Sequence, residues 1–236
     1  MDVLMQAEAL DSYRTRCIES FLNYSARESQ GYTLSSISNQ AVISLQDATS
    51  SIPLLDNCEI AIVNSKADNG FPHTRPPNIV CIPDSMCSES KASSKFVETL
   101  IHEAIHVHQR LNKNMWADGL KRAKWIPVSP ERIPDTYKER LRLNPDTILE
   151  QFWSWSDYHV PLPMFRSVHT PSLDQINVEW MDLRTGALFH VPPKGFLEAY
   201  PQQIHQMEHP YEIYAEIFAA KGIKTEELLK KALNEL

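Results

Sequence analysis

Residues 93–111 read SSKFVETLIHEAIHVHQRL. Apolar residues recur in this stretch at spacings of three and four, which predicts an α-helix that begins at the serines and runs to about Leu111. On a helical wheel the apolar side chains cover an arc of roughly 180°, and the polar ones form a narrow stripe that contains His102, Glu103 and His106. A surface helix has a wider charged face. The pattern therefore indicates a buried helix with one functional face.

His102, Glu103 and His106 form an HExxH motif. Positions four apart lie on one face of a helix, so both imidazoles can reach the same metal ion. Glu103 points about 100° away from His102, toward the substrate side, where its carboxylate can accept a proton from water that the metal activates. A chain of this composition matches the motif by chance only about 0.03 times, which disfavours two ordinary histidines beside an incidental glutamate. The motif predicts one zinc ion (Zn2+) per chain.

The third zinc ligand should come from another segment, because a catalytic zinc usually has three protein ligands and one open position. Residues 209–216, which read HPYEIYAE, form the best downstream candidate. The proline at position 210 suits the start of a helix, and Glu212 and Glu216 then share a face with His209 close to it. The spacing alone leaves Glu212, Glu216 and His209 open as the third ligand.

The two segments together resemble the gluzincin branch of the zincin metallopeptidases, in which an HExxH helix supplies two ligands and a later helix supplies a glutamate. The resemblance implies that Glu212 is the third ligand and that Glu216, one turn further on, orients a ligand imidazole. It also implies an α+β fold, with a small mixed β-sheet and the active-site helix in one lobe and a mostly helical second lobe. From His106 to Glu212 is 106 positions. This is longer than in compact gluzincins, so a large insertion is expected between the two helices.

We expect residues 1–236 to form one zincin-like catalytic unit, with an N-terminal lobe of about residues 1–125 and a C-terminal lobe of about residues 126–236. Short apolar runs predict strands at residues 60–63 and 78–83. The second run ends in a proline, which suits an edge strand or a strand terminus, and it lies where zincins hold extended substrate by β-addition. An ordinary edge strand fits the same pattern equally well.

Further elements follow from the same periodicities. They are helices in the first thirty residues, within 35–51 and at about 196–207, 210–221 and 225–235, an extended connection at about 126–146, and strands at 176–183 and 187–191.

The residues that would support catalysis are less well defined by the sequence. Arg110 lies on the metal-binding face and could hold a substrate carboxylate or form an internal ion pair with Glu212 or Glu216. The tetrahedral oxyanion of peptide hydrolysis needs a donor besides the metal. The candidate donors are Tyr158, Tyr200, Tyr211, Tyr214, His190 and His205, with His209 as a further candidate for substrate contact. The pair Trp153 and Trp155 is expected to pack in the core rather than to line a subsite.

The composition bounds the class of protein. Hydrophobic residues make up 42% of the chain and charged residues 22%, so a packed core is expected. The net charge of -7 argues against nonspecific binding of nucleic acids. The start of the chain lacks a signal-peptide pattern and no apolar run approaches the roughly 18 residues of a membrane span, so we expect a soluble intracellular protein. The four cysteines form no CxxC pair and are expected to be reduced thiols. The oligomeric state stays open.

The sequence therefore predicts a zinc-dependent metallopeptidase that hydrolyses peptide or protein substrates with Glu103 as general base. The same chemistry would serve a zinc hydrolase that acts on a non-peptide amide or ester, and the motif does not separate the two. A zincin-like binding protein with a structural metal is a third hypothesis. An intact Glu103 argues against this third hypothesis, because a purely structural site has no use for a base.

Overall fold

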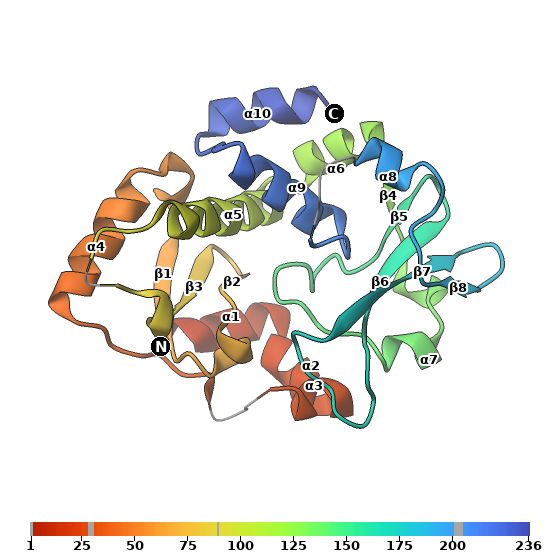
Figure 1. The fold of residues 1–236 in the computed structure, drawn as a ribbon, viewed down its shortest axis with the longest axis horizontal. Coiled ribbons are helices and arrows are strands. Elements are labelled where there is room, and N and C mark those ends of the chain that lie inside the picture. Colours follow the sequence, from red (N-terminus) through yellow and green to blue (C-terminus); the bar gives the residue numbers. More distant parts are fainter. Residues whose placement is uncertain (1, 28–30, 89, 201–204) are drawn as a thin grey trace.

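The computed structural model describes residues 2–27, 31–88, 90–200 and 205–236. Over these residues the chain is a mixed α/β structure, with two separate small sheets and several helices (Figure 1), which is compatible with the α+β class. The strands are β1 (Glu59–Val63), β2 (His73–Arg75), β3 (Ile79–Pro83), β4 (Trp125–Pro127), β5 (Trp153–Trp155), β6 (His159–Phe165), β7 (Ile176–Asp182) and β8 (Leu188–Phe189). The α-helices are α1 (Val3–Asp11), α2 (Tyr13–Glu19), α3 (Phe21–Ser25), α4 (Asn39–Ser50), α5 (Ser94–Leu111), α6 (Lys113–Arg122), α7 (Asp135–Lys138), α8 (Phe196–Ala199), α9 (Pro210–Ala220) and α10 (Glu226–Asn234).

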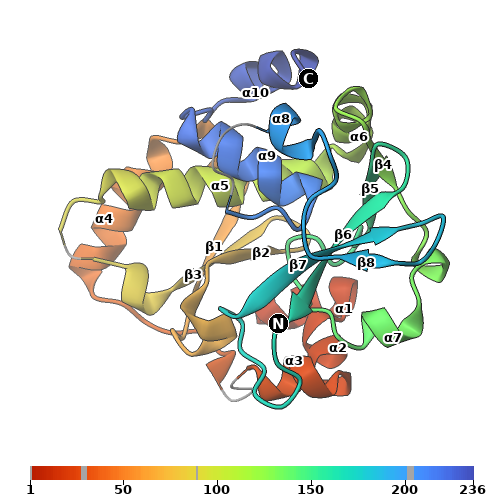
Figure 2. The ribbon, with the colours of Figure 1, turned by 45° about the vertical axis from the view of Figure 1, so that its right-hand side comes forward.

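The first sheet has three strands in the order β1-β3-β2, with β1 parallel and β2 antiparallel to β3. α5 lies along one side of this sheet and α1 lies on the opposite side (Figure 1, Figure 2). All residues of β3 are buried, as its unbroken apolar run requires of a strand that is covered on both faces. The expectation that residues 78–83 form an edge strand is therefore wrong. β3 is the central strand, and β2 lies at the edge next to α5.

The helical pattern of the N-terminal residues is divided among the three short helices α1, α2 and α3. Ser12 adopts a left-handed conformation with a φ of 51° between α1 and α2, and Ser20 is extended between α2 and α3. These breaks change the direction of the chain, so that α1 contacts β2 and Leu22 of α3 packs against Phe165 of β6. They bring Tyr13 and Arg27 to the wall of the large cavity described below.

α5 begins and ends where the sequence predicts. Ser93 caps it by accepting a hydrogen bond from the backbone N–H of Phe96 at 3.1 Å. Its second half, from Glu103 to Gln109, is buried, as the narrow polar stripe indicates. α9 packs against α5, and both helices share one large apolar core with Trp153 and Trp155. The two tryptophans are therefore core residues, as expected.

The second sheet is antiparallel throughout, in the order β4-β5-β6-β7-β8. The expectation of a mostly helical second lobe is therefore wrong. Pro161 and Pro163 make the long central strand β6 difficult to recognise in the sequence. Prolines fit here because the backbone of Pro163 faces away from β7, and its carbonyl accepts a hydrogen bond from the N–H of Arg142 at 2.8 Å. The strands predicted at 176–183 and 187–191 are confirmed as β7 and β8.

The C-terminal region is helical, but less so than the sequence suggests. α9 and α10 confirm two of the predicted helices. The helix predicted at 196–207 is shorter, because α8 ends at Ala199, residues 201–204 lie outside the described part of the chain, and residues 205–207 are not helical. In the parts of the chain that the structure describes, no helix is both long and apolar enough to cross a membrane.

Candidate metal centre

Three side chains from α5 and α9 converge on one point. His102 and His106 lie one turn apart on α5, and Glu212 lies in the first turn of α9. Nε2 of His106 is 3.0 Å from Nε2 of His102 and 3.2 Å from Oε2 of Glu212, and Nε2 of His102 is 3.3 Å from the same oxygen. A tetrahedral zinc with bonds of about 2.0–2.1 Å places its ligand atoms about 3.3 Å apart. The triangle therefore has the size of one face of a zinc site.

Gln109 sets the orientation of the His106 ring. The side-chain amide nitrogen of Gln109 donates to the backbone carbonyl of Tyr211 at 2.9 Å, which leaves its Oε1 to accept from Nδ1 of His106 at 2.7 Å. When neutral, His106 therefore carries its proton on Nδ1 and presents the lone pair of Nε2 to the triangle. The same side chain joins α5 to α9.

Asn144 holds the carboxylate of Glu212. Its side-chain amide nitrogen donates to Oε1 of Glu212 at 2.6 Å and to Oε1 of Glu208 at 3.1 Å. The other oxygen of Glu212 is the one in the triangle. Burial opposes ionisation of Glu212, but the imidazoles of His106 and His102 hold the pKa of this carboxyl well below its usual value. Glu212 is therefore an anionic ligand candidate with one oxygen free for a metal.

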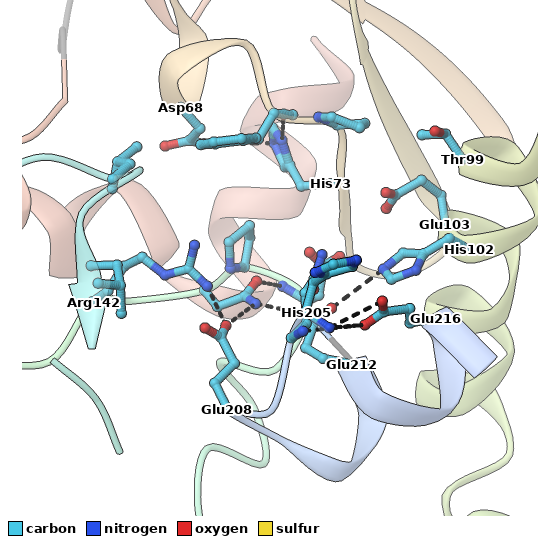
Figure 3. A pocket seen from close by; sticks show the side chains of 18 of the residues that line it. Asp68, His73, Thr99, His102, Glu103, Arg142, His205, Glu208, Glu212 and Glu216 are labelled. Carbon is cyan, nitrogen blue, oxygen red and sulfur yellow. Dashed lines mark hydrogen bonds and ion pairs between the residues drawn. The ribbon is translucent and has the colours of Figure 1, made fainter. Parts of the chain in front are cut away.

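Glu216 does not orient an imidazole, contrary to the expectation. Its carboxylate accepts hydrogen bonds from the backbone N–H of His205, at 3.0 and 3.1 Å, and of Gln206, at 3.2 Å. These backbone N–H groups engage the Glu216 carboxylate in place of an imidazole. Glu216 instead fixes the loop that enters α9 (Figure 3).

His209 and Tyr211 are not part of the triangle either, which corrects their candidate roles as ligand or substrate contact. His209 caps α9, since its Nδ1 accepts from the backbone N–H of Tyr211 at 3.1 Å and its Nε2 donates to the backbone carbonyl of Glu150 at 2.8 Å. Burial lowers the pKa of His209 to about 4. The hydroxyl of Tyr211 donates to the carboxylate of Glu150. Both side chains serve the local structure.

Arg110 does not form the ion pair with Glu212 or Glu216 that the sequence suggests, and it is not among the residues that line the cavity described below. Its guanidinium donates to the hydroxyl of Thr74 at 2.6 Å and to the backbone carbonyl of Arg75 at 3.3 Å. These contacts tie α5 to the edge strand β2.

Glu103 is a buried carboxylate with unused bonding capacity. Its side chain lines the cavity, only 3% of the residue is exposed, and its Oε2 has no hydrogen-bond partner. Burial, together with the nearby carboxylate of Asp146, raises the pKa of Glu103 to about 7. A carboxylate with this proton affinity and a free oxygen is suited to accept and return a proton near neutral pH.

One cavity of about 600 Å³ contains the metal-facing groups. His102, Glu103 and Glu212 line it, as do Asp146 and His205 (Figure 3). Of the six candidate oxyanion donors, only His205 lines this cavity. The others are engaged elsewhere. Tyr200 and Tyr214 bond to each other in the core, Tyr211 bonds to Glu150, His190 pairs with Glu179 on the surface, and Tyr158 packs on Arg184.

The edge strand β2 offers no free N–H to a paired peptide. The backbone N–H of Thr74 faces away from β3 and donates to Oδ1 of Asp146 at 2.6 Å, and its hydroxyl donates to the same oxygen at 2.6 Å. Positions two residues away along a strand face the same way. These positions are Pro72 and Pro76, which have no N–H. Asp146 therefore caps the one donor that β-addition would use.

Gln109, Asn144 and Asp146 are the site residues that the sequence analysis missed. Gln109 had a detectable signal, because a residue three positions after His106 lies beside it on the helix surface. Asn144 and Asp146 had none, because they come from the connection at 126–146, whose path depends on tertiary structure.

Comparison of the chain with known protein families, with curated proteins and with solved structures finds no match. The residues of the site are therefore the basis for a functional assignment.

Proposed function

We propose that this chain is a zinc-dependent metallopeptidase with a zincin-like fold and a gluzincin-type ligand set of His102, His106 and Glu212. The observation that carries the proposal is the triangle of ligand atoms, with edges of 3.0, 3.2 and 3.3 Å. Its other supports are the helix α5 against a small mixed sheet with an antiparallel edge strand, and the later helix α9 that supplies the carboxylate.

The donor set fits zinc in particular. Two neutral imidazole nitrogens and one carboxylate oxygen are typical ligands of catalytic zinc, whereas magnesium and calcium prefer oxygen ligands alone. The partners behind the ligands are in place, because Gln109 holds His106 and Asn144 holds Glu212. When bound, a zinc ion polarises the substrate carbonyl and lowers the pKa of a coordinated water toward 7.

Glu103 and His205 would carry out the remaining chemistry. The free Oε2 of Glu103 accepts the proton of the attacking water, and the resulting acid donates it to the leaving nitrogen. The imidazole of His205 lines the same cavity and would donate a hydrogen bond to the substrate oxygen as negative charge develops there. Glu216 supports this role by holding the backbone of His205.

A hydrolase of a non-peptide amide or ester is the second candidate. The observation that favours it is the cap of Asp146 on Thr74, because an extended peptide would find no free N–H on β2. A purely structural metal is disfavoured by Glu103. A buried, unpartnered carboxylate destabilises a fold by about 1–3 kcal/mol or more and has no structural use here.

The test is hydrolysis by the zinc-loaded protein. The purified chain is incubated with a peptide library and with a panel of simple amides and esters, and products are identified by mass spectrometry. We expect cleavage that a chelator abolishes and zinc restores. Cleavage of peptides separates the first candidate from the second. Absence of any product from the zinc-loaded protein overturns both.

A further inference from the structure

The cavity extends beyond the metal centre into a charged recess. Arg142, Asp68, His73 and Glu208 line the same cavity as Glu103. Figure 3 shows Arg142 reaching toward the centre of the cavity from the side opposite Glu103, with Glu208 beneath its guanidinium and Asp68 and His73 above it. None of these four side chains belongs to the ligand triangle.

Arg142 is held at one nitrogen and unsatisfied at another. Its Nη2 donates to Oε1 of Glu208, while its Nε is buried and has no hydrogen-bond partner. A buried donor without a partner is unfavourable for the fold. The guanidinium of an arginine is planar and can bind a carboxylate with two parallel hydrogen bonds. The Arg142 side chain is 20% exposed, so the part of its guanidinium that Glu208 does not hold can contact a ligand in the cavity.

The charged groups next to Arg142 form a mixed cluster. Asp68 is the carboxylate above Arg142, and three cationic groups surround it: Arg27 at 2.9 Å, Arg14 at 3.8 Å and His73 at 3.8 Å. Burial opposes protonation of His73, but the surrounding Tyr32, Cys81 and Asp68 raise its pKa well above the usual value. Glu208 balances Arg142. Arg14, Arg27 and His73 therefore outnumber the carboxylate that they surround, whereas Asp146, Asp174 and Glu212 line the same cavity without these three partners.

Arg142 lies close enough to the metal centre to contact a neighbouring part of the substrate. Its Nη2 contacts Oε1 of Glu208, which Asn144 joins to the carboxylate of Glu212. Each hydrogen bond spans about 3 Å, so the guanidinium lies within about 9 Å of that carboxylate. An extended residue spans roughly 3.5 Å. This places the recess one or two residues from a bond positioned at the triangle.

We propose that Arg142 forms a subsite for a carboxylate group of the substrate, located one or two residues from the bond that is hydrolysed. The carboxylate belongs to an acidic side chain or to the C-terminus of a peptide, since both offer the same planar pair of oxygens. The position relative to the hydrolysed bond rests on the proposed function, whereas the binding of a carboxylate does not.

Binding, measured without hydrolysis, tests the subsite. The full chain carrying Glu103→Gln is loaded with zinc and titrated with two pairs of peptides by isothermal calorimetry. The first pair is acetyl-Ala-Ala-Glu-Ala-Ala-amide and its Gln counterpart. The second pair is acetyl-pentaalanine with a free carboxylate and with an amide. We expect at least one carboxylate peptide to bind at least about tenfold more tightly than its neutral counterpart. The pair that shows the preference identifies the source of the carboxylate.

Arg142→Gln should abolish the preference, and Arg142→Lys should retain part of it, because lysine keeps the charge but not the planar guanidinium. Arg140→Gln is the matched control, since Arg140 is exposed nearby, and it should leave the preference unchanged. If Arg142→Gln unfolds the chain, the double variant Arg142→Gln, Glu208→Gln removes the ion pair as a unit and should show the same loss. Equal binding within both pairs overturns the subsite. So does a preference that survives in Arg142→Gln, because zinc alone would then account for it.

Discussion

Oε1 of Gln109 lies 2.7 Å from Nδ1 of His106. Because the amide nitrogen of Gln109 is already committed to the backbone carbonyl of Tyr211, this oxygen can only act as an acceptor. The contact therefore selects the tautomer of His106 in which Nε2 is free to bind a metal.

Gln109→Met should weaken zinc binding about 10–100-fold, the usual effect of losing a partner behind a metal ligand. The three ligands remain, so binding should weaken without being abolished. Competition with a chromophoric chelator measures the affinity, and melting of the metal-free protein shows whether the fold is retained. Lys95→Gln, at an exposed position of α5, is the control. An unchanged affinity in a folded Gln109→Met protein would show that the contact has no role in metal binding.

Zinc binding should release a proton even at pH values well above the usual pKa of histidine. In the metal-free protein, burial opposes protonation of His106, but the carboxylate of Glu212 raises the pKa of His106 to about 10. His106 is therefore protonated at pH 8, and zinc must displace that proton. We expect about one proton released per zinc at pH 8 and an affinity that rises up to about tenfold per pH unit between pH 7 and 9.

Calorimetry at pH 8 in two buffers with different heats of ionisation measures this release. Glu212→Gln removes the charge that holds the proton, so any residual binding should release less. A binding heat that is the same in both buffers for the parent protein would contradict the prediction.

The helix α5 and two of the proposed ligands could be predicted from the sequence because both depend on local periodicity. The resemblance to gluzincins pointed to Glu212, whose oxygen does complete the triangle. The partner assigned to Glu216 was wrong, since it depended on where one more helical turn places a side chain. The roles of Asn144 and Asp146 could not be predicted from the sequence, for a different reason. Their connection crosses to α9 and β2 only in the folded chain, and no local pattern encodes that path.

Asp146→Asn should shift the acid limb of any pH–rate profile to lower pH. After burial, the charge of Asp146 is the largest cause that raises the pKa of Glu103. Asparagine keeps an oxygen for the N–H of Thr74 but removes that charge. The pKa of Glu103 then falls, and the base stays deprotonated in more acidic solution. The measurement is kcat/KM of the zinc-loaded protein between pH 5 and 9. A shift toward higher pH would be the opposite of what the geometry requires.

His209 should make the fold sensitive to acid. Its folded-state pKa of about 4 lies below the unfolded value of about 6.5, so the unfolded chain binds the extra proton first. The stability that neutral His209 contributes is fully present above about pH 6.5 and is lost as the pH falls toward 4. The loss amounts to up to about 3 kcal/mol in the free energy of unfolding. His209→Asn keeps a capping side chain that does not titrate. Urea unfolding at pH 4.5 and 7 should show a smaller loss for the variant, and parallel losses in both proteins would refute this role.

Glu103→Gln separates catalysis from metal binding. The side chain is not a member of the ligand triangle, so the variant should hold zinc as the parent does. It lines the same cavity with an unpartnered oxygen, and glutamine fills the same volume there without being able to take up a proton. We therefore expect hydrolysis to fall by at least about 10²-fold, the lower end for loss of a general base, while zinc content stays the same. Burial of the charged form destabilises the parent, so the neutral amide should leave the melting temperature unchanged or raise it. Zinc content, melting and product formation are measured on both proteins side by side. A variant that keeps its zinc and cleaves at the parent rate would exclude Glu103 as the base and leave the proton transfer to another group of the cavity.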